Sequence, residues 1–221
     1  MPRVSEEYFE NKRKEILDAA YRVCVRKPIT SVVMKDIIDE TGFSHGVIYK
    51  YYKDLDEVLT DLVIRINSEN RIDEDLNAIL DREGTKNWET AVRRVCDLLV
   101  DSMKRVGRDM MKLSLYCDHL AMSDPERVNR IAVNLGKDGQ SPLVYLVASM
   151  DAYLRDVIKK EKLHPVKSVD EILQFIMVSF QGIQSGYVLS ACFDEEQVKG
   201  KYLPEEMFSC LAESVILMIK G

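Results

Sequence analysis

The stretch TGFSHGVIYKYYKDLDEVL, from Thr41 to Leu59, joins a helix-ending glycine to a short segment rich in tyrosine. Gly42 suits the left-handed position that closes a helix, because glycine has no Cβ to clash there. Ser44 is placed to cap the next helix, since a serine hydroxyl accepts from the orphan N–H groups of a first turn. So short a helix buries little apolar surface, and we expect its exposed face to carry its function.

Helical patterns flank this stretch on both sides. Apolar residues recur at helical spacing in two runs before it, from Ile16 to Cys24 and from Met34 to Ile38. After it, Asp54 and Glu57 have the spacing of a capping box that opens another helix. The order helix, tight turn, short helix predicts a helix-turn-helix, whose second helix places side chains in the DNA major groove.

An alternative is a helical hairpin whose tyrosines are half-buried core. In the helix-turn-helix interpretation, Phe43 plugs the hinge against the first helix, and Gly46 lets backbone approach DNA. The second helix would span about Ser44 to Tyr51, and its exposed face would carry His45, Tyr49, Lys50 and Tyr51.

The whole chain reads as all-α. Helical stripes recur over about 88–106, 110–122, 143–157, 168–191 and from Pro204 onward, and no stretch shows sustained period-two alternation. We expect a three-helix DNA-binding domain over residues 1–54, followed by a larger helical domain over residues 55–221.

Bulk composition sets limits on function. Hydrophobic residues make up 46% of the 221 residues and charged residues 31%, as in soluble globular proteins. The net charge of −6, with 10 basic and 11 acidic residues in the first 57, speaks against broad attraction to nucleic acid. Any DNA-binding surface must then be a local basic face.

Residues 10–60 resemble the DNA-binding domain of the tetracycline-repressor (TetR) family of transcriptional regulators. The resemblance rests on Ile16, Leu17, Ala19, Ala20, Asp36, Ile37, Gly42, Ser44, Gly46, Tyr49, Tyr52, Glu57 and Leu59. It implies a ligand-responsive regulator, a homodimeric repressor that leaves a pseudo-palindromic operator on double-stranded DNA when a small apolar or amphipathic effector binds. An activator, or a regulator that responds to no ligand, would share every one of these features.

Carried over residue by residue, the resemblance implies a recognition helix from Ser44 to Tyr51. Ser44, His45, Gly46 and Lys50 would face bases or phosphates, Tyr49 would bind phosphate, and Tyr52 would be structural. Two residues depart from the family pattern. Leu55 stands where a phosphate-binding lysine is usual, and Val33 stands where a capping Ser or Thr is usual, so Thr30 or Ser31 should cap instead. The candidates to replace the lost phosphate contacts are Lys12, Arg13, Lys35 and Lys53.

The family uses the rest of the chain for dimerisation and for an effector pocket. The segment FQGIQSGYVL is apolar nearly all round and has small residues at three- and four-residue spacing, which suits close helix packing, either between protomers or within one. We expect the dimer interface at Ser179, Gly182, Gly186, Phe208, Leu211 and Val215. Pocket candidates are Met103, Met110, Tyr116, Met150, Tyr153, Phe175 and Gln181, although methionines at helical spacing more often belong to plain core.

Several classes of function are not expected. No nucleophile–base set, phosphate loop or metal-ligand spacing is present, so we predict no enzyme activity, no catalytic residues, no cofactor and no metal. No apolar run is long enough for a membrane helix, and the N-terminus is too polar for a signal peptide, so a cytoplasmic protein is expected. The five cysteines are scattered and read as buried thiols, with Cys117 the candidate if one is a redox sensor. The rival class is a helical enzyme or protein-interaction module with no role on DNA.

Overall fold

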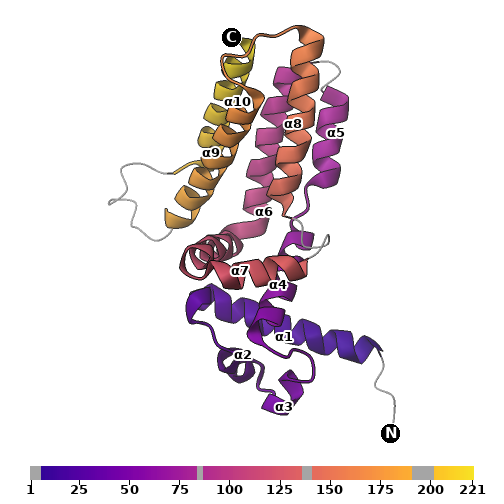
Figure 1. The fold of residues 1–221 in the computed structure, drawn as a ribbon, viewed down its shortest axis with the longest axis vertical. Coiled ribbons are helices and arrows are strands. Elements are labelled where there is room, and N and C mark those ends of the chain that lie inside the picture. Colours follow the sequence, from indigo (N-terminus) through magenta and orange to yellow (C-terminus); the bar gives the residue numbers. More distant parts are fainter. Residues whose placement is uncertain (1–5, 84–86, 136–140, 191–201) are drawn as a thin grey trace. The chain divides into compact units, whose positions relative to one another are not determined.

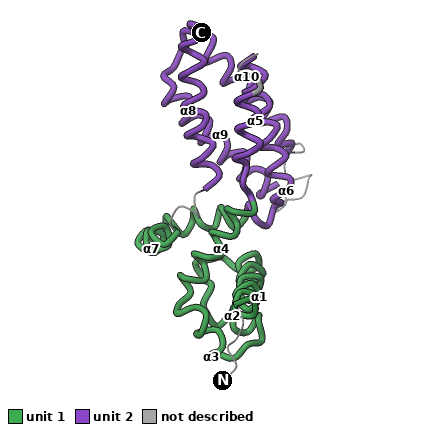
Figure 2. The backbone as a smooth tube through the Cα atoms, turned by 90° about the vertical axis from the view of Figure 1, so that its right-hand side faces the viewer, with its two compact units in different colours: residues 1–69, 112–140 green, residues 70–111, 141–221 purple. Residues whose placement is uncertain are grey.

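The computed structural model describes residues 6–83, 87–135, 141–190 and 202–221. All regular secondary structure within these ranges is helical (Figure 1), as the sequence predicts. By contact, the chain divides into two compact units, one of residues 1–69 and 112–140 and the other of residues 70–111 and 141–221 (Figure 2). The expected functional boundary after residue 54 therefore falls inside the first unit.

The first unit holds the N-terminal helices and two later segments. Its elements are α1 (Glu6–Arg26), the 3-10 turn η1 (Ile29–Ser31), α2 (Met34–Thr41), α3 (His45–Ile48), α4 (Leu55–Glu69), the end of α6 (Trp88–Ser123) and α7 (Pro125–Leu135). α1 packs on α2 and α4, and α4 packs on α7. Their buried faces are the predicted apolar stripes, with Ile16, Ile37 and Val58 fully enclosed.

The second unit is built from α5 (Asp73–Glu83), the beginning of α6, α8 (Pro142–Glu161), α9 (Val169–Leu189) and α10 (Pro204–Lys220). No helix was expected at α5, whose first half is acidic and whose inward face offers only a short apolar run around the buried Leu76. Gly107 has φ 79° and ψ 164°, a break inside α6 that matches the two helices predicted for this stretch. The expected end of α9 near Ala191 lies outside the described residues, as does Cys192.

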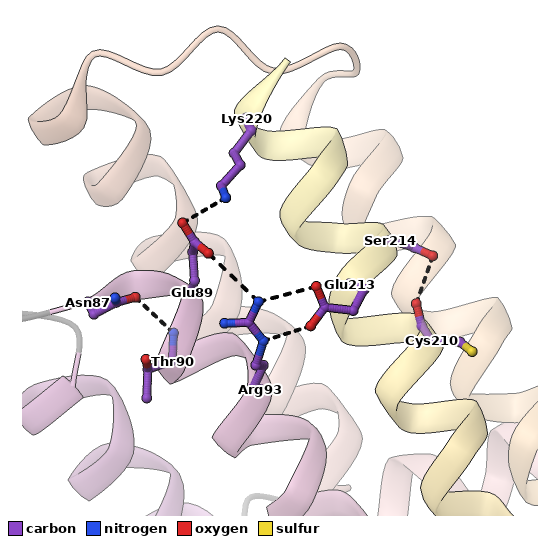
Figure 3. A network of polar contacts seen from close by, with 8 residues as sticks. All are labelled: Asn87, Glu89, Thr90, Arg93, Cys210, Glu213, Ser214 and Lys220. Carbon is purple, nitrogen blue, oxygen red and sulfur yellow. Dashed lines mark hydrogen bonds and ion pairs between the residues drawn. The ribbon is translucent and has the colours of Figure 1, made fainter.

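An ion-pair network joins α6 to α10 within the second unit (Figure 3). The Arg93 guanidinium donates to both carboxylate oxygens of Glu213, at 2.7 and 3.2 Å. Glu89 bridges Arg93 and Lys220, at 3.7 and 2.9 Å. These groups are largely exposed, so solvent screens the network and its contribution to stability is small.

The face of α10 that the sequence assigned to a dimer interface is buried inside the protomer. Phe208, Leu211 and Val215 are at most 4% exposed, and the Phe208 ring lies 6.1 Å from that of Phe180 on α9. Gly186 was also expected at the interface, but a Cβ there would lie 2.6 Å from the Tyr202 ring of the same chain. These four assignments are wrong, because Phe208, Leu211 and Val215 are core residues of the protomer and Gly186 lies against Tyr202, which precedes α10.

Several apolar side chains also lie on the outer faces of α9 and α10. Val178, Leu189 and Leu217 are each at least half exposed, and a Cβ at Gly182 would meet open space. α9 is long and apolar enough to cross a membrane by composition, with a mean hydropathy of 1.3, although no such run was expected. Buried helices of soluble proteins satisfy the same test, and α9 packs on both α8 and α10.

Candidate nucleic-acid interface

The turn between α2 and α3 is built by Gly42. Its φ of 70° is left-handed, and its N–H donates to the Ile38 carbonyl at 3.0 Å, closing α2 as predicted. The Thr41 hydroxyl donates to the same carbonyl at 2.9 Å and accepts from the Phe43 N–H at 3.1 Å. Phe43 is half-buried, with the Lys12 ammonium of α1 4.5 Å from its ring centroid, so it does plug the hinge against α1.

The start of α2 is capped differently from the prediction. Val33 is the N-cap residue, and its N–H donates to the Asp36 carboxylate at 2.8 Å. Lys27 also donates to Asp36, at 2.7 Å, and these two bonds hold the pKa of Asp36 below its ordinary value. Thr30 and Ser31 lie in η1, so the expectation that either caps α2 is wrong. The Asp36 carboxylate, three residues into the helix, thus satisfies the N–H of the N-cap residue, and no side chain accepts from the first-turn N–H groups at the N-cap.

α3 is shorter than expected, spanning only His45–Ile48. Turn hydrogen bonds carry the chain onward to Tyr52, whose N–H donates to the Ile48 carbonyl at 3.1 Å. Ser44 stands at the N-cap position as predicted, but its hydroxyl makes no capping hydrogen bond. That hydroxyl is therefore not committed to the helix.

The segment from Ser44 to Lys50 presents a continuous exposed face. Ser44, His45, Gly46 and Lys50 are exposed, and Tyr49 is 51% exposed. The His45 and Tyr49 rings lie nearly parallel, with centroids 6.4 Å apart. A Cβ on Gly46 would meet no atom within 4 Å, so this backbone is open to an approaching surface.

Tyr51 does not belong to this face, contrary to the prediction. It is 9% exposed, and its ring centroid lies 4.6 Å from that of Phe9 on α1. It follows the fully buried Ile48 by three residues, which places both on the inner side of the turn. Tyr51 therefore anchors the Ser44–Lys50 segment to α1, and its ring is not part of the exposed face.

Tyr52 is a core residue, as expected, and together with Asp61 it holds Arg13, a candidate for contact with phosphate. Its hydroxyl donates to Asp61 at 3.0 Å, and burial raises its pKa. Arg13 pairs with the same carboxylate while its guanidinium lies 4.8 Å from the Tyr52 ring centroid. Arg13 is thus held by α4 and is not free to reach phosphate.

Few basic side chains remain free on this unit. Lys53 pairs with Glu57 at 3.0 Å, and Glu57 also accepts from the Lys53 N–H, which lowers the pKa of Glu57. Lys12 pairs with Glu15 at 2.9 Å. Within residues 6–69, Lys14, Lys35 and Lys50 make no ion pair. Lys50 is therefore the unpaired cation of the exposed Ser44–Lys50 face, and Lys35 is an unpaired cation on α2.

Two of the seven expected pocket residues are on the surface: Phe175 is 41% exposed, and Gln181 is exposed. Both lie on outward positions of α9, so they line no enclosed pocket in the protomer. Met103 and Met150 are buried, and the Tyr153 hydroxyl is buried without a hydrogen-bond partner. The sequence-based list did not include Gln184, a buried polar residue whose side-chain amide donates to Met111 Sδ at 2.9 Å.

Three of the four described cysteines, among them the candidate Cys117, are poor candidates for redox sensing. Burial raises the pKa of Cys24 and Cys96 to about 12 and that of Cys117 to about 11. A thiol must ionise to react, so these remain neutral and inert near neutral pH. Among the described residues, no cluster of His, Cys, Asp and Glu could hold a metal ion.

Gly42→Ala should lower the free energy of unfolding by about 1–2 kcal/mol, the cost of a left-handed backbone for an L-residue. No atom lies within 4 Å of the added Cβ, so the loss would come from backbone conformation alone. Urea unfolding measures it, with Gly46→Ala as the control at an unstrained helical glycine. Equal destabilisation by the two variants would contradict this account of the turn.

A small helical unit with a tight glycine turn and an exposed short helix defines a DNA-binding regulator of the helix-turn-helix class. Residues 16–62 match the family model for bacterial regulatory proteins of the tetR family. The match covers the helix-turn-helix part of the chain, which is similar to that family.

Known relatives extend this similarity over the whole chain. The uncharacterized HTH-type transcriptional regulator YfiR of Bacillus subtilis is 24% identical over 99% of this chain and 95% of its own length. FadR of Bacillus halodurans has the same fold, with a TM-score of 0.63, 15% identity and coverage of 92% and 94% of the two chains. FadR of Bacillus subtilis, solved with stearoyl-CoA, gives a TM-score of 0.63 at 16% identity over 92% and 97%.

Proposed function

We propose that this protein is a homodimeric repressor of the TetR family that binds a pseudo-palindromic operator through residues 1–54. The observation that carries the proposal is the exposed Ser44–Lys50 segment behind the Gly42 turn. Its side chains are polar or small, its hydroxyls are not used in capping, and its backbone at Gly46 is open. Such a surface suits direct contact with base edges and phosphates.

Each exposed residue has a role that fits its chemistry. His45 and Lys50 donate to base edges or phosphates, and Ser44 and Tyr49 offer hydroxyls to phosphate. Lys35 on α2 supplies positive charge for the neighbouring phosphates of the DNA backbone. Lys53 contributes only if its pair with Glu57 opens, because that pair otherwise occupies its ammonium.

The homodimer is supported by the outer face of α9. Val178, Gly182 and Leu189 on that helix are apolar or small and are open in the protomer. Pairing two such surfaces about a twofold axis removes them from water, and a twofold dimer suits a pseudo-palindromic operator whose half-sites are about 34–36 Å apart.

The effector is proposed to be a small apolar or amphipathic molecule. One structural neighbour was solved with stearoyl-CoA, a ligand of that class. A ligand that binds better to the conformation unable to span both half-sites shifts the population away from DNA, by no more than its differential affinity. Such a regulator works in the cytoplasm, on the chromosome, without catalysis.

A salt titration tests the DNA interface. On DNA from upstream of its own gene, the log affinity of the dimer should fall linearly with log salt, with a slope set by the phosphates neutralised. Lys50→Gln should weaken operator binding. If Lys50 contacts phosphate, the slope becomes shallower by about two units per dimer, one contact per monomer. If it contacts a base, the slope changes little and specificity relaxes at one position.

Lys159→Gln is the matched control, because Lys159 is exposed on α8 in the other unit. It should leave both affinity and slope unchanged. Absence of salt-dependent binding by the wild type would favour the rival class, a helical protein-interaction module or enzyme. Equal effects of the two substitutions would remove Lys50 from the interface.

A further inference from the structure

One side chain on the exposed Ser44–Lys50 face has no polar atom. Val47 lies within α3 and is 37% exposed, although the next residue, Ile48, is fully buried. The structure describes the whole of this segment, and its other exposed side chains carry a hydroxyl, an imidazole or an ammonium group. A valine side chain can neither donate nor accept a hydrogen bond, so Val47 adds nothing to the polar contacts of this face.

Backbone hydrogen bonds fix the position of Val47. Its N–H donates to the Ser44 carbonyl at 3.0 Å, and its carbonyl accepts from the Lys50 N–H at 3.2 Å. Side chains three residues apart on a helical turn are neighbours, so the valine lies between the Ser44 and Lys50 side chains. A β-branched side chain has one strongly preferred rotamer in a helix, so the two methyl groups of Val47 are held in place as well.

The adjacent Gly46 allows so short a side chain to reach another molecule. A Cβ at Gly46 would meet no atom within 4 Å, so the backbone of α3 is open on this side. A surface that approaches this backbone closely also comes within reach of the methyl groups of Val47. If α3 enters the major groove, as the proposed function requires, that surface is formed by the edges of the bases.

The base edges in the major groove offer a valine one apolar partner. Thymine carries a methyl group at C5, and the characteristic groups of the other bases there are hydrogen-bond donors and acceptors. Contact between Val47 and the thymine methyl removes apolar surface of both from water. A donor or acceptor covered by Val47 would instead lose its hydrogen bonds to water without a replacement. The side chain therefore favours thymine at the position that it touches.

We propose that Val47 is a specificity-determining residue that recognises thymine through its 5-methyl group. The proposal rests on the proposed function, because it needs α3 to lie in the major groove, and it adds a base identity to that function. Each half-site of the operator has a thymine opposite Val47. His45 and Lys50 read hydrogen-bonding groups, whereas Val47 reads the apolar one.

Deoxyuridine tests this contact, because it lacks only the methyl group of thymidine and still pairs with adenine. The full-length protein first selects its operator from a pool of random-sequence duplexes. Each thymine of that operator is then replaced in turn by deoxyuridine, symmetrically in both half-sites. At one position, wild-type affinity should fall about fourfold per half-site, or about 15-fold for the dimer, the value of burying one methyl group at each. Fluorescence anisotropy at fixed salt measures the dissociation constants.

Val47→Ala should bind the thymine operator more weakly and should no longer distinguish thymine from deoxyuridine at that position. Val33→Ala is the matched control, because it makes the same change at another exposed valine of the helix-turn-helix, at the N-cap of α2. It should keep the full difference between the two duplexes. Both valines are exposed, so both variants should have the far-UV circular dichroism of the wild type.

Three results would overturn the assignment. Wild-type binding that no deoxyuridine weakens would mean that no methyl group is read. A deoxyuridine effect that persists in Val47→Ala would assign the methyl contact to another residue. Equal weakening of both duplexes by Val47→Ala would place the valine against the sugar–phosphate backbone. If the wild type selects no duplex at all, the proposed function fails together with this contact, whereas the first three results leave DNA binding standing.

Discussion

Gly46→Leu should weaken operator binding on the order of 100-fold at fixed salt, about 2.7 kcal/mol, while leaving the protein folded. The position is exposed within α3, and a Cβ there meets no atom within 4 Å, so the fold has room for the larger side chain. Leucine is also a better helix former than glycine. The added side chain would instead stand between the α3 backbone and the DNA, separating neighbouring contacts by more than a hydrogen bond spans.

The graded variant Gly46→Ala is the control for this effect. A methyl group intrudes less than an isobutyl group, so its loss of affinity should be smaller while its stability is the same or higher. Fluorescence anisotropy with operator DNA and urea unfolding measure the two quantities separately. Wild-type affinity for Gly46→Leu would remove α3 from the DNA interface.

Local sequence signals predicted the turn well and the capping only in part. Gly42 is a nearly unambiguous signal, because few residues tolerate φ near 70°. The prediction for the start of α2 failed because it considered only the side chain of Val33. The hydrogen bond at this position joins the Val33 N–H to the carboxylate of Asp36, three residues inside the helix. The spacing of Asp36 from Val33 is present in the sequence and would have predicted this hydrogen bond.

The misplacement of Tyr51 has a different cause. One tyrosine of the run YKYY was expected to be structural, but two are, since Tyr51 packs on Phe9 and Tyr52 on Arg13 and Asp61. Helical spacing from Ile48 predicts both positions as inward once the turn continues the helix. Helical periodicity therefore predicts which tyrosines are buried better than the aromatic content of the segment does.

Features that depend on distant segments could not be predicted from the sequence. An apolar cavity between α4, the end of α6 and α7 is lined by residues near positions 29, 59–66, 113–120 and 128–135, and no local pattern links them. The same limit explains the α10 error. An apolar stripe shows that Phe208, Leu211 and Val215 are buried, but not whether α9 of the same chain or another protomer covers them.

Val178→Glu should convert the protein from dimer to monomer in the micromolar range. Val178 is 69% exposed on the outer face of α9, so the protomer tolerates a glutamate there. In a twofold dimer, each interface would bury two such carboxylates without partners, at a cost of several kcal/mol, or about 100-fold or more in the dissociation constant. Operator affinity should fall with dimerisation, because one protomer reaches only one half-site.

Val144→Glu is the matched control, the same substitution at a 54% exposed valine on α8 of the same unit. Sedimentation velocity over a concentration series should show a dimer for the wild type and for Val144→Glu, and a monomer for Val178→Glu. Far-UV circular dichroism should be the same for all three, because neither valine is buried in the protomer. A dimer that survives Val178→Glu would place the interface elsewhere. If both variants dissociate, the cause is the added negative charge. An interface at Val178 explains the loss of the dimer only if Val144→Glu stays dimeric.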